Sequence, residues 1–397
     1  MRSSRHPVLK GKPAAVLGVP RNSGVAEAAT EEAKGPDGLS AGGEAAYRHY
    51  SPSTDPKIAI SVIVIAYNRK KYIKRAIESL LNQSFKNFEI IVVKNFEDAE
   101  FDSFLEQNHI INIHINKSEI GAHYAEGMKF AKGNLIAFLD DDDYYDETKL
   151  ERVYEIFNKN KNLCLYYNNI YAVNDEEAII SSHDRRAIPI GRRIELKNEM
   201  LLTNNLGTKR KLQIMKYYEA FWSPSCIVIK KDPALPYLSK FEKIHYAPGI
   251  FLASVFAELN CDFFLDNRKL TYYRIHTSAS HASLSNKLEY FKNREEFYLK
   301  SLISLNLTKD NVNDKYILDF LNIFLITTKF YYYLYSQSAV VSKGDLLSDL
   351  LTINKSKYLL RISELVVISS IPLIITIIPR KILRNMFYYL EKKRAKF

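Results

Sequence analysis

Cysteine is scarce in this chain of 397 residues, and long uncharged apolar runs are missing. The three cysteines, Cys164, Cys226 and Cys261, lie far apart, and an odd, scattered set predicts neither a disulfide framework nor a zinc site. We therefore expect a reducing compartment. No apolar run of signal-peptide length follows Met1, so the sequence predicts no secretory signal.

Glycine and proline are unevenly distributed, because residues 1–57 hold 7 of the 14 glycines and 6 of the 13 prolines. This segment has too little apolar surface to offset the entropy of ordering it, so we expect a disordered or artificially added leader. Beyond it, 47% hydrophobic and 25% charged residues are typical of a chain with a buried core, which excludes collagen-like, coiled-coil and wholly disordered classes. The length predicts two domains, or one large domain with an appendage.

Strands and helices alternate between residues 58 and 145. Ile58–Ala66 and Phe88–Val93 are β-branched runs typical of strands buried on both faces, and Ile111–Ile115 resembles a third strand. Apolar residues at helical spacing predict helices at Lys71–Asn82 and Gly121–Ala131. This alternation predicts α/β architecture with a mostly parallel sheet, whose ligands bind at the carboxyl ends of the strands.

Four adjacent aspartates, at positions 140 to 143, follow a further predicted strand, Leu135–Leu139. Adjacent carboxylates repel one another, so a buried strand end tolerates them only beside a cation or solvent. Magnesium-type ions combine one or two carboxylates with substrate phosphates. The pattern therefore favours a metal–diphosphate site, and the alternative is a solvated acidic turn that caps the next helix.

With these segments in order, the sequence resembles the inverting GT-A-fold glycosyltransferases of family 2. The resemblance covers about residues 58–283 and implies a GT-A fold, which is a Rossmann-like, mostly parallel sheet flanked by helices. The segments that carry it are the opening strand and turn Ser61–Arg69 with the helix end Ser79–Ser84, the second strand Phe88–Val93, the stretch Gly121–Asp143 and the closing Tyr273–Ser280.

The resemblance also implies roles for individual residues. It implies that Asp140 and Asp142 hold a divalent metal, Mn²⁺ or Mg²⁺, and that Arg274 and His276 contact the diphosphate. The metal would neutralise the departing diphosphate. The residues implied in nucleotide binding are Ala66, Tyr67, Arg69, Asn95, Asp140 and Asp141.

Two positions depart from the family pattern. The second strand usually runs into a carboxylate that reads the base, but here it runs into Lys94, which cannot accept a hydrogen bond. Asn95, or the acids at 97 and 98, are the candidate replacements. The family's general base is an aspartate that falls near Gly249 in this chain, so the candidate catalytic bases are His245 and Glu242. An inactivating substitution at Gly249 is the alternative.

The C-terminal third, residues 284–397, reads as helical. Tyr316–Ser336 is apolar but interrupted by charges, and Leu365–Pro379 has 15 uncharged residues, is broken by Pro372, and falls short of the roughly 20 that a span needs. Basic residues follow, and the net charge is +11. We therefore expect residues 363–397 to insert at an anionic membrane surface. A buried helical hairpin and a true span are the alternatives. No nucleic-acid-binding motif is present.

Together these features predict a metal-dependent glycosyltransferase at the cytoplasmic face of the cell membrane, peripheral or monotopic. It would move a sugar from a nucleotide-diphosphate sugar to a lipid-linked or surface-glycan acceptor, with inversion. One alternative is a glycosyltransferase-like binding protein that has lost catalysis. Another is a sugar-phosphate nucleotidylyltransferase, which needs a glycine-rich loop after the first strand, whereas residues 67–70 contain no glycine.

Overall fold

The structure is a computed structural model that describes residues 58–180, 194–259, 261–276, 286–337, 341–352, 359–360 and 362–395. The expected leader at 1–57 and the end of the predicted closing segment, from residue 277, lie outside the described residues. The predicted division into domains at residues 283 and 284 falls there as well, so it stays a prediction.

The first half of the sheet is parallel, as the alternating pattern predicts. Strands β1 (Ile60–Ala66), β2 (Phe88–Lys94), β3 (Ile111–His114) and β4 (Leu135–Asp140) lie in the order β3-β2-β1-β4. Every residue of β1 is buried, which explains its unbroken run of β-branched side chains. The register pairs Ala66 with Lys94 and Ile65 with Asp140, so the carboxyl ends of these strands meet at one edge.

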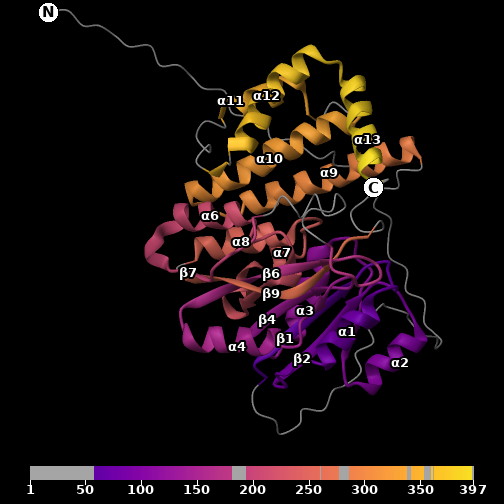
Figure 1. Ribbon diagram of the computed structural model, residues 1–397, viewed down its shortest axis with the longest axis vertical. Coiled ribbons are helices and arrows are strands. Elements are labelled where there is room, and N and C mark those ends of the chain that lie inside the picture. The colour runs from indigo at the N-terminus through magenta and orange to yellow at the C-terminus, as the bar shows by residue number, and fades with distance from the viewer. Residues whose placement is uncertain are drawn as a thin grey trace, which may run out of the picture. The chain divides into compact units, whose positions relative to one another are not determined.

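Helices connect these strands and cover both faces of the sheet (Figure 1). Helices α1 (Ile73–Leu81), α2 (Ala99–Gln107) and α4 (Lys149–Lys159) cover one core, which receives Val62 and Val64 of β1. Helices α3 (Ile120–Phe130), α6 (Gly207–Tyr218) and α8 (Pro248–Glu258) cover the other, which receives Ile63 and Ile65. The alternation of β1 side chains between two cores follows from the twofold period of a strand.

Beyond β4 the sheet becomes mixed. Strand β8 (Ile227–Lys230) runs antiparallel to β4 and to β6 (Leu163–Val173), whereas β6 and β9 (Asp262–Arg274) are parallel. The two-residue strand β5 pairs Tyr144 with Tyr272 of β9. This pairing holds the end of β9 against the acidic turn that follows β4. The remaining short elements are β7 (Met200–Leu202), η2 (Asn204–Leu206), η3 (Pro224–Cys226), η4 (Asp232–Tyr237) and α7 (Leu238–Phe241).

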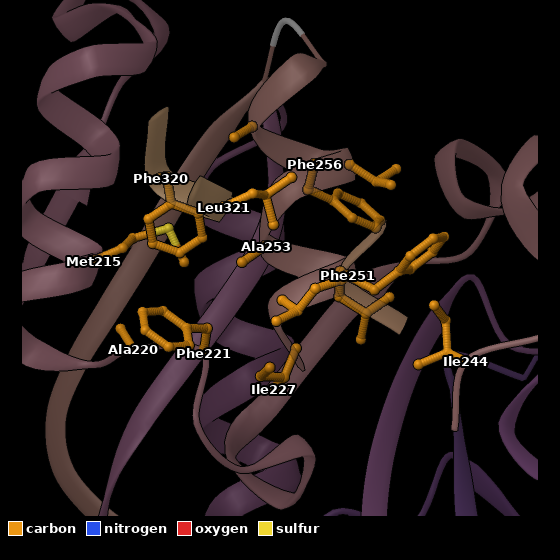
Figure 2. Packing of buried hydrophobic residues seen from close by; sticks show 14 of the residues in the cluster. Met215, Ala220, Phe221, Ile227, Ile244, Phe251, Ala253, Phe256, Phe320 and Leu321 are labelled. Carbon is orange, nitrogen blue, oxygen red and sulfur yellow. The ribbon is translucent and has the colours of Figure 1, made fainter. Parts of the chain in front are cut away.

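The C-terminal helices are α9 (Lys287–Lys309), α10 (Lys315–Tyr335), α11 (Lys343–Thr352), α12 (Ile362–Ile377) and α13 (Arg380–Ala395). Figure 2 shows Phe320 and Leu321 of α10 among side chains of α6 and α8, and the Phe320 ring lies 5.3 Å from that of Phe221. The apolar segment Tyr316–Ser336 therefore belongs to the protein core. Within the described part of the chain, no helix combines the length and apolar character needed to cross a membrane.

Two details differ from the sequence-based expectations. The structure joins Cys164 to Cys261 in a disulfide between the starts of the neighbouring strands β6 and β9, where we expected no disulfide. Cys226 is free and buried. In addition, Pro372 lies inside α12 and does not end it. The four residues before Pro372 belong to the same helix, so the apolar residues from Leu365 to Ile377 form one continuous helix.

Candidate active site

Three of the four consecutive aspartates converge at the end of β4. Asp140, Asp142 and Asp143 each present a carboxylate oxygen, and these oxygens all lie within 4.8 Å of one another. Asp143 accepts a hydrogen bond of 3.0 Å from the Arg274 amide through Oδ1, but its buried Oδ2 has no partner among the described residues. A buried, unsatisfied carboxylate oxygen beside two further carboxylates fits a hard divalent cation. The sequence predicted Asp140 and Asp142 as metal ligands and did not include Asp143, although it belongs to the same run.

Neighbouring side chains fix the acidic turn. The Tyr124 hydroxyl of α3 donates to Asp140, and the Asp140 amide donates to Ser225 Oγ at 3.1 Å. Arg69 forms an ion pair with Asp141, and its Nη2 also lies 2.8 Å from Asp142 Oδ2. The turn after β1 and the turn after β4 are therefore tied together through one guanidinium group.

The crowded carboxylates have displaced pKa values. Burial raises the pKa of Asp140 to about 6, and the charge of Asp142 adds to this while Tyr124 and Arg69 oppose it. Burial raises the pKa of Asp141 to about 7 against the opposing hydrogen bond from Arg69. For Asp142, burial would raise the pKa, but the His276 hydrogen bond and the Arg69 charge outweigh it and lower the value. A divalent cation would favour the ionised form of the whole set.

Two predicted residues at the end of β9 and just after it have different surroundings. His276 Nε2 lies 2.9 Å from Asp142 Oδ2 and 3.3 Å from Arg69 Nη1, so it faces the acidic turn. Arg274 is buried, and its donors contact the main-chain oxygens of Asp142, Asn174 and Asp175 and the Glu177 carboxylate. Arg274 thus supports the turn from within the protein, and its contact with a diphosphate stays a prediction.

At the end of β2, Lys94 and Asn95, which stand where the family has other residues, both form polar contacts within the protein. Lys94 is buried and pairs with Asp102 of α2 at 2.9 Å. Asn95 Nδ2 donates to Asn68 Oδ1 at 2.7 Å, and the Asn68 main-chain amide donates to Asn95 Oδ1 at 2.7 Å. Asp98 caps α2 by accepting from the Phe101 amide. Ala66 ends β1 and is fully buried, so it contributes only main chain to the strand-end edge.

A cavity of about 710 Å³ opens beside the same edge of the sheet. It brings Tyr67, which follows β1, together with Glu242 and His245, which precede α8. Glu119 also lines it; sequence reasoning missed this residue, which lies in the connection between β3 and α3, immediately before the helix. The full lining comprises Tyr67, Asn116, Lys117, Ser118, Glu119, Glu242, Lys243, His245 and Leu307.

Two histidines are held close to this cavity. The amide of His245 donates to Ser304 Oγ at 3.0 Å, while its buried Nδ1 has no partner within the described residues. The His123 ring lies edge-on to Tyr67 with a centroid distance of 5.6 Å, and burial lowers its pKa, which favours the neutral ring. Burial would raise the pKa of Glu119, but a backbone hydrogen bond and the neighbouring His245 lower it.

Gly249 occupies the second position of α8 and is buried. A Cβ atom added there would lie 2.0 Å from the main-chain oxygen of Phe221 and 3.3 Å from Ile227 Cδ1. Because the nearest obstacle is backbone, the chain has no room for the family's carboxylate at this position. The local structure is therefore built around glycine.

Comparisons with known proteins place the chain among glycosyltransferases. Residues 61–234 match the family described as Glycosyl transferase family 2, a range that includes the first three motifs but not the closing Tyr273–Ser280. An uncharacterized glycosyltransferase of Haemophilus influenzae is 26% identical over 276 residues, which are 68% of this chain and 86% of that protein.

Two further proteins are similar over other shares of the chain. The Escherichia coli UDP-Glc:alpha-D-GlcNAc-diphosphoundecaprenol beta-1,3-glucosyltransferase WfaP is 36% identical over 121 residues, 29% of this chain and 47% of that protein. The chain thus matches less than half the length of WfaP. The crystal structure of S. aureus TarS 1-349 in complex with UDP-GlcNAc covers 75% of this chain and 81% of its own, at 15% identity and a TM-score of 0.45. From the family match and these relatives, residues 61–234 are a glycosyl transferase family 2 domain, and the chain is a glycosyltransferase.

Proposed function

We propose that this glycosyltransferase moves a sugar from a nucleotide-diphosphate sugar to an acceptor hydroxyl in a single, inverting displacement that depends on a divalent metal. The observation that carries the proposal is the convergence of Asp140, Asp142 and Asp143, with a buried Asp143 oxygen that has no partner among the described residues. The cavity lined by Tyr67, Glu242 and His245 lies at the same strand-end edge and supplies space for substrates.

The three carboxylates would hold Mn²⁺ or Mg²⁺, because hard divalent cations prefer oxygen ligands. When bound, the metal supplies Lewis-acid stabilisation of the leaving nucleotide diphosphate. Arg69 and His276 present N–H groups beside Asp142, where they would contact the anionic diphosphate. Tyr67 has 42% of its surface exposed, and its ring offers a platform for the nucleotide base.

His245 is the proposed general base. Its ring lines the cavity, and the bond between its amide and Ser304 fixes its main chain. A neutral imidazole accepts a proton from the acceptor hydroxyl as that oxygen attacks the sugar. Glu242 lines the same cavity and is the second candidate, although Lys129 lies 3.9 Å from its carboxylate.

A lipid-linked acceptor is the favoured class. WfaP, whose name describes a diphosphoundecaprenol-linked acceptor, is similar to 29% of this chain. We therefore propose that the enzyme works on a lipid-linked or glycan acceptor as a peripheral protein at the membrane surface. A glycosyltransferase-like binding protein without catalysis is the second candidate, because Gly249 leaves no room for a carboxylate.

The test is release of nucleotide diphosphate from UDP- and GDP-sugars, with and without Mn²⁺. The expected result is metal-dependent hydrolysis or transfer that falls about 10²–10⁴-fold in His245→Ala. Glu242→Gln, in the same cavity, tests the second candidate base in the same assay. Donor binding without any turnover, in every donor tested, would contradict the catalytic proposal and favour the binding protein.

A further inference from the structure

Helix α13 buries one of its sides against the C-terminal helices. Tyr388 and Phe387 pack there: the Tyr388 ring lies 5.2 Å from that of Tyr290, and the Phe387 ring lies 6.2 Å from that of Phe330. Leu383, one turn earlier, is also buried. These contacts give α13 an inner face: Tyr388 is buried and Phe387 is half-buried against the core, although both belong to the segment expected at a lipid interface.

The opposite side of α13 is apolar as well. Ile382, Met386 and Tyr389, with Leu390 beside them, recur at helical spacing and are all exposed. Leu373 and Ile377 are exposed one turn apart on α12, just before the connection at residues 378–379. We call the four residues of α13 the exposed apolar face, and each of them is between 48% and 60% exposed.

Such a face is unusual on a helix that already has a buried side. A surface helix of a soluble protein normally turns charged and polar residues outward. Apolar residues that gather on one surface mark sites of interaction with another protein or with a membrane. We therefore expect the exposed apolar face to be covered by another protein or by a membrane.

The charges around the face identify its occupant. Arg380, Lys381, Arg384 and Lys392 lie on α13, and none of them forms an ion pair within the described part of the chain. The acid of the helix, Glu391, is engaged by Arg294 at 2.9 Å. Arg380 lies over the Tyr333 ring at 4.8 Å and Arg384 over the Phe291 ring at 4.5 Å, and each has a buried nitrogen, so both turn toward the inner side of the helix. The cations left beside the face are Lys381, which is exposed, and Lys392, which is half-buried. A second copy of this chain would bring the same positive charges, whereas an anionic lipid surface neutralises them.

We propose that the exposed apolar face of α13 docks on an anionic phospholipid bilayer, with the helix lying in the plane of the interface. Apolar side chains enter the boundary between headgroups and acyl chains, and the flanking cations contact the headgroup phosphates. The inference deepens the proposed function, since it would bring the enzyme to a lipid-linked acceptor. It needs neither donor nor acceptor to be tested, so its failure is distinguishable from failure of the catalytic proposal.

The experiment is flotation of the full-length protein with vesicles of phosphatidylcholine alone or with added phosphatidylglycerol, at low and at high salt. The expected result is co-flotation with anionic vesicles only, weakened by salt. The triple variant Ile382→Ser/Met386→Ser/Tyr389→Ser should lose binding. The double variant Lys381→Gln/Lys392→Gln should bind about 25-fold more weakly, about fivefold per charge.

A matched control replaces three exposed apolar residues elsewhere, Leu206→Ser/Tyr217→Ser/Leu235→Ser, whose exposed fractions are 42%, 46% and 42%. This control should float like the natural chain, which excludes a general effect of surface polarity. Three outcomes would overturn the proposal: no flotation with anionic vesicles, equal flotation of the α13 triple variant, or a dimer that the same triple variant dissociates in the absence of lipid.

Discussion

Replacing Gly249 by aspartate restores the residue that the family places near this position, but the structure predicts a loss of stability and no gain in turnover. Any Cβ atom at 249 would lie 2.0 Å from the Phe221 oxygen and 3.1 Å from its carbonyl carbon, well inside ordinary contact distance. Because both atoms belong to the backbone, relief requires a shift of the loop before η3. Overpacking of this kind costs about 1–3 kcal/mol.

The aspartate carboxylate adds a second cost. Gly249 is buried, so the new charge would lose water without gaining a cation beside it, a penalty of roughly 2 kcal/mol or more. The helix dipole returns only about 0.3–1 kcal/mol at the start of α8. We therefore expect Gly249→Asp to lower the free energy of unfolding by about 3 kcal/mol or more, and Gly249→Ala by about 1–2 kcal/mol.

Urea unfolding followed by fluorescence of Trp222, the residue next to Phe221, measures this change directly. Gly344→Ala is the matched control, because its added Cβ would meet nothing closer than Ser342 Oγ at 3.5 Å. That variant should be neutral or stabilised by up to about 1 kcal/mol, as expected for alanine in a helix. A Gly249→Asp enzyme that is as stable as the natural chain and turns over faster would refute the reasoning.

Three further predictions concern buried polar groups. His245→Ala should lower kcat about 10²–10⁴-fold with a smaller change in KM, and a pH–rate profile that keeps its acidic limb in this variant would exclude His245 as the base. Burial lowers the pKa of Lys149 to about 7, so the unfolded chain binds more protons between pH 7 and 10.5 and stability rises with pH across that window. Lys149→Met should flatten this rise, as measured by urea unfolding at several pH values. Lys94→Met should destabilise the protein by about 1–3 kcal/mol, because Asp102 loses its buried partner, while nucleotide affinity stays unchanged; a large loss of affinity would place Lys94 in the site.

Local sequence patterns predicted the parallel half of the sheet, in which consecutive strands and helices follow one another closely along the chain. Strands β1 to β4 and helices α1 and α3 follow from β-branched runs and helical spacing within about 90 residues, and the match over residues 61–234 confirms the family that their motifs predicted. The pairing of β6 with β9 was not predictable in this way. It joins segments about 100 residues apart, and so does the Cys164–Cys261 disulfide, with a separation of 97.

The candidate site also has features that the sequence predicts and features that only the packing of distant segments reveals. Asp140 and Asp142 can be predicted as candidate ligands from the sequence, because Asp140 ends a strand and Asp142 follows it closely. The partnerless Asp143 oxygen cannot, because it depends on how β9 packs against the turn. The obstruction at Gly249 comes from Phe221, which lies 28 positions earlier in the chain. Likewise, the basic and aromatic composition of α13 indicated an interface, but only packing shows that Tyr389 faces outward while Tyr388 faces inward.

The proposed function depends on a metal that is held by the carboxylates at and after the end of β4 and that binds a nucleotide diphosphate. Calorimetric titration of UDP and GDP into the full-length protein, with and without Mn²⁺, tests it most directly. We expect metal-dependent binding that Asp142→Asn abolishes and that the exposed variant Asp232→Asn retains, with all three proteins folded, as shown by a cooperative urea transition. Unchanged Mn²⁺-dependent affinity in Asp142→Asn would contradict the metal-site assignment.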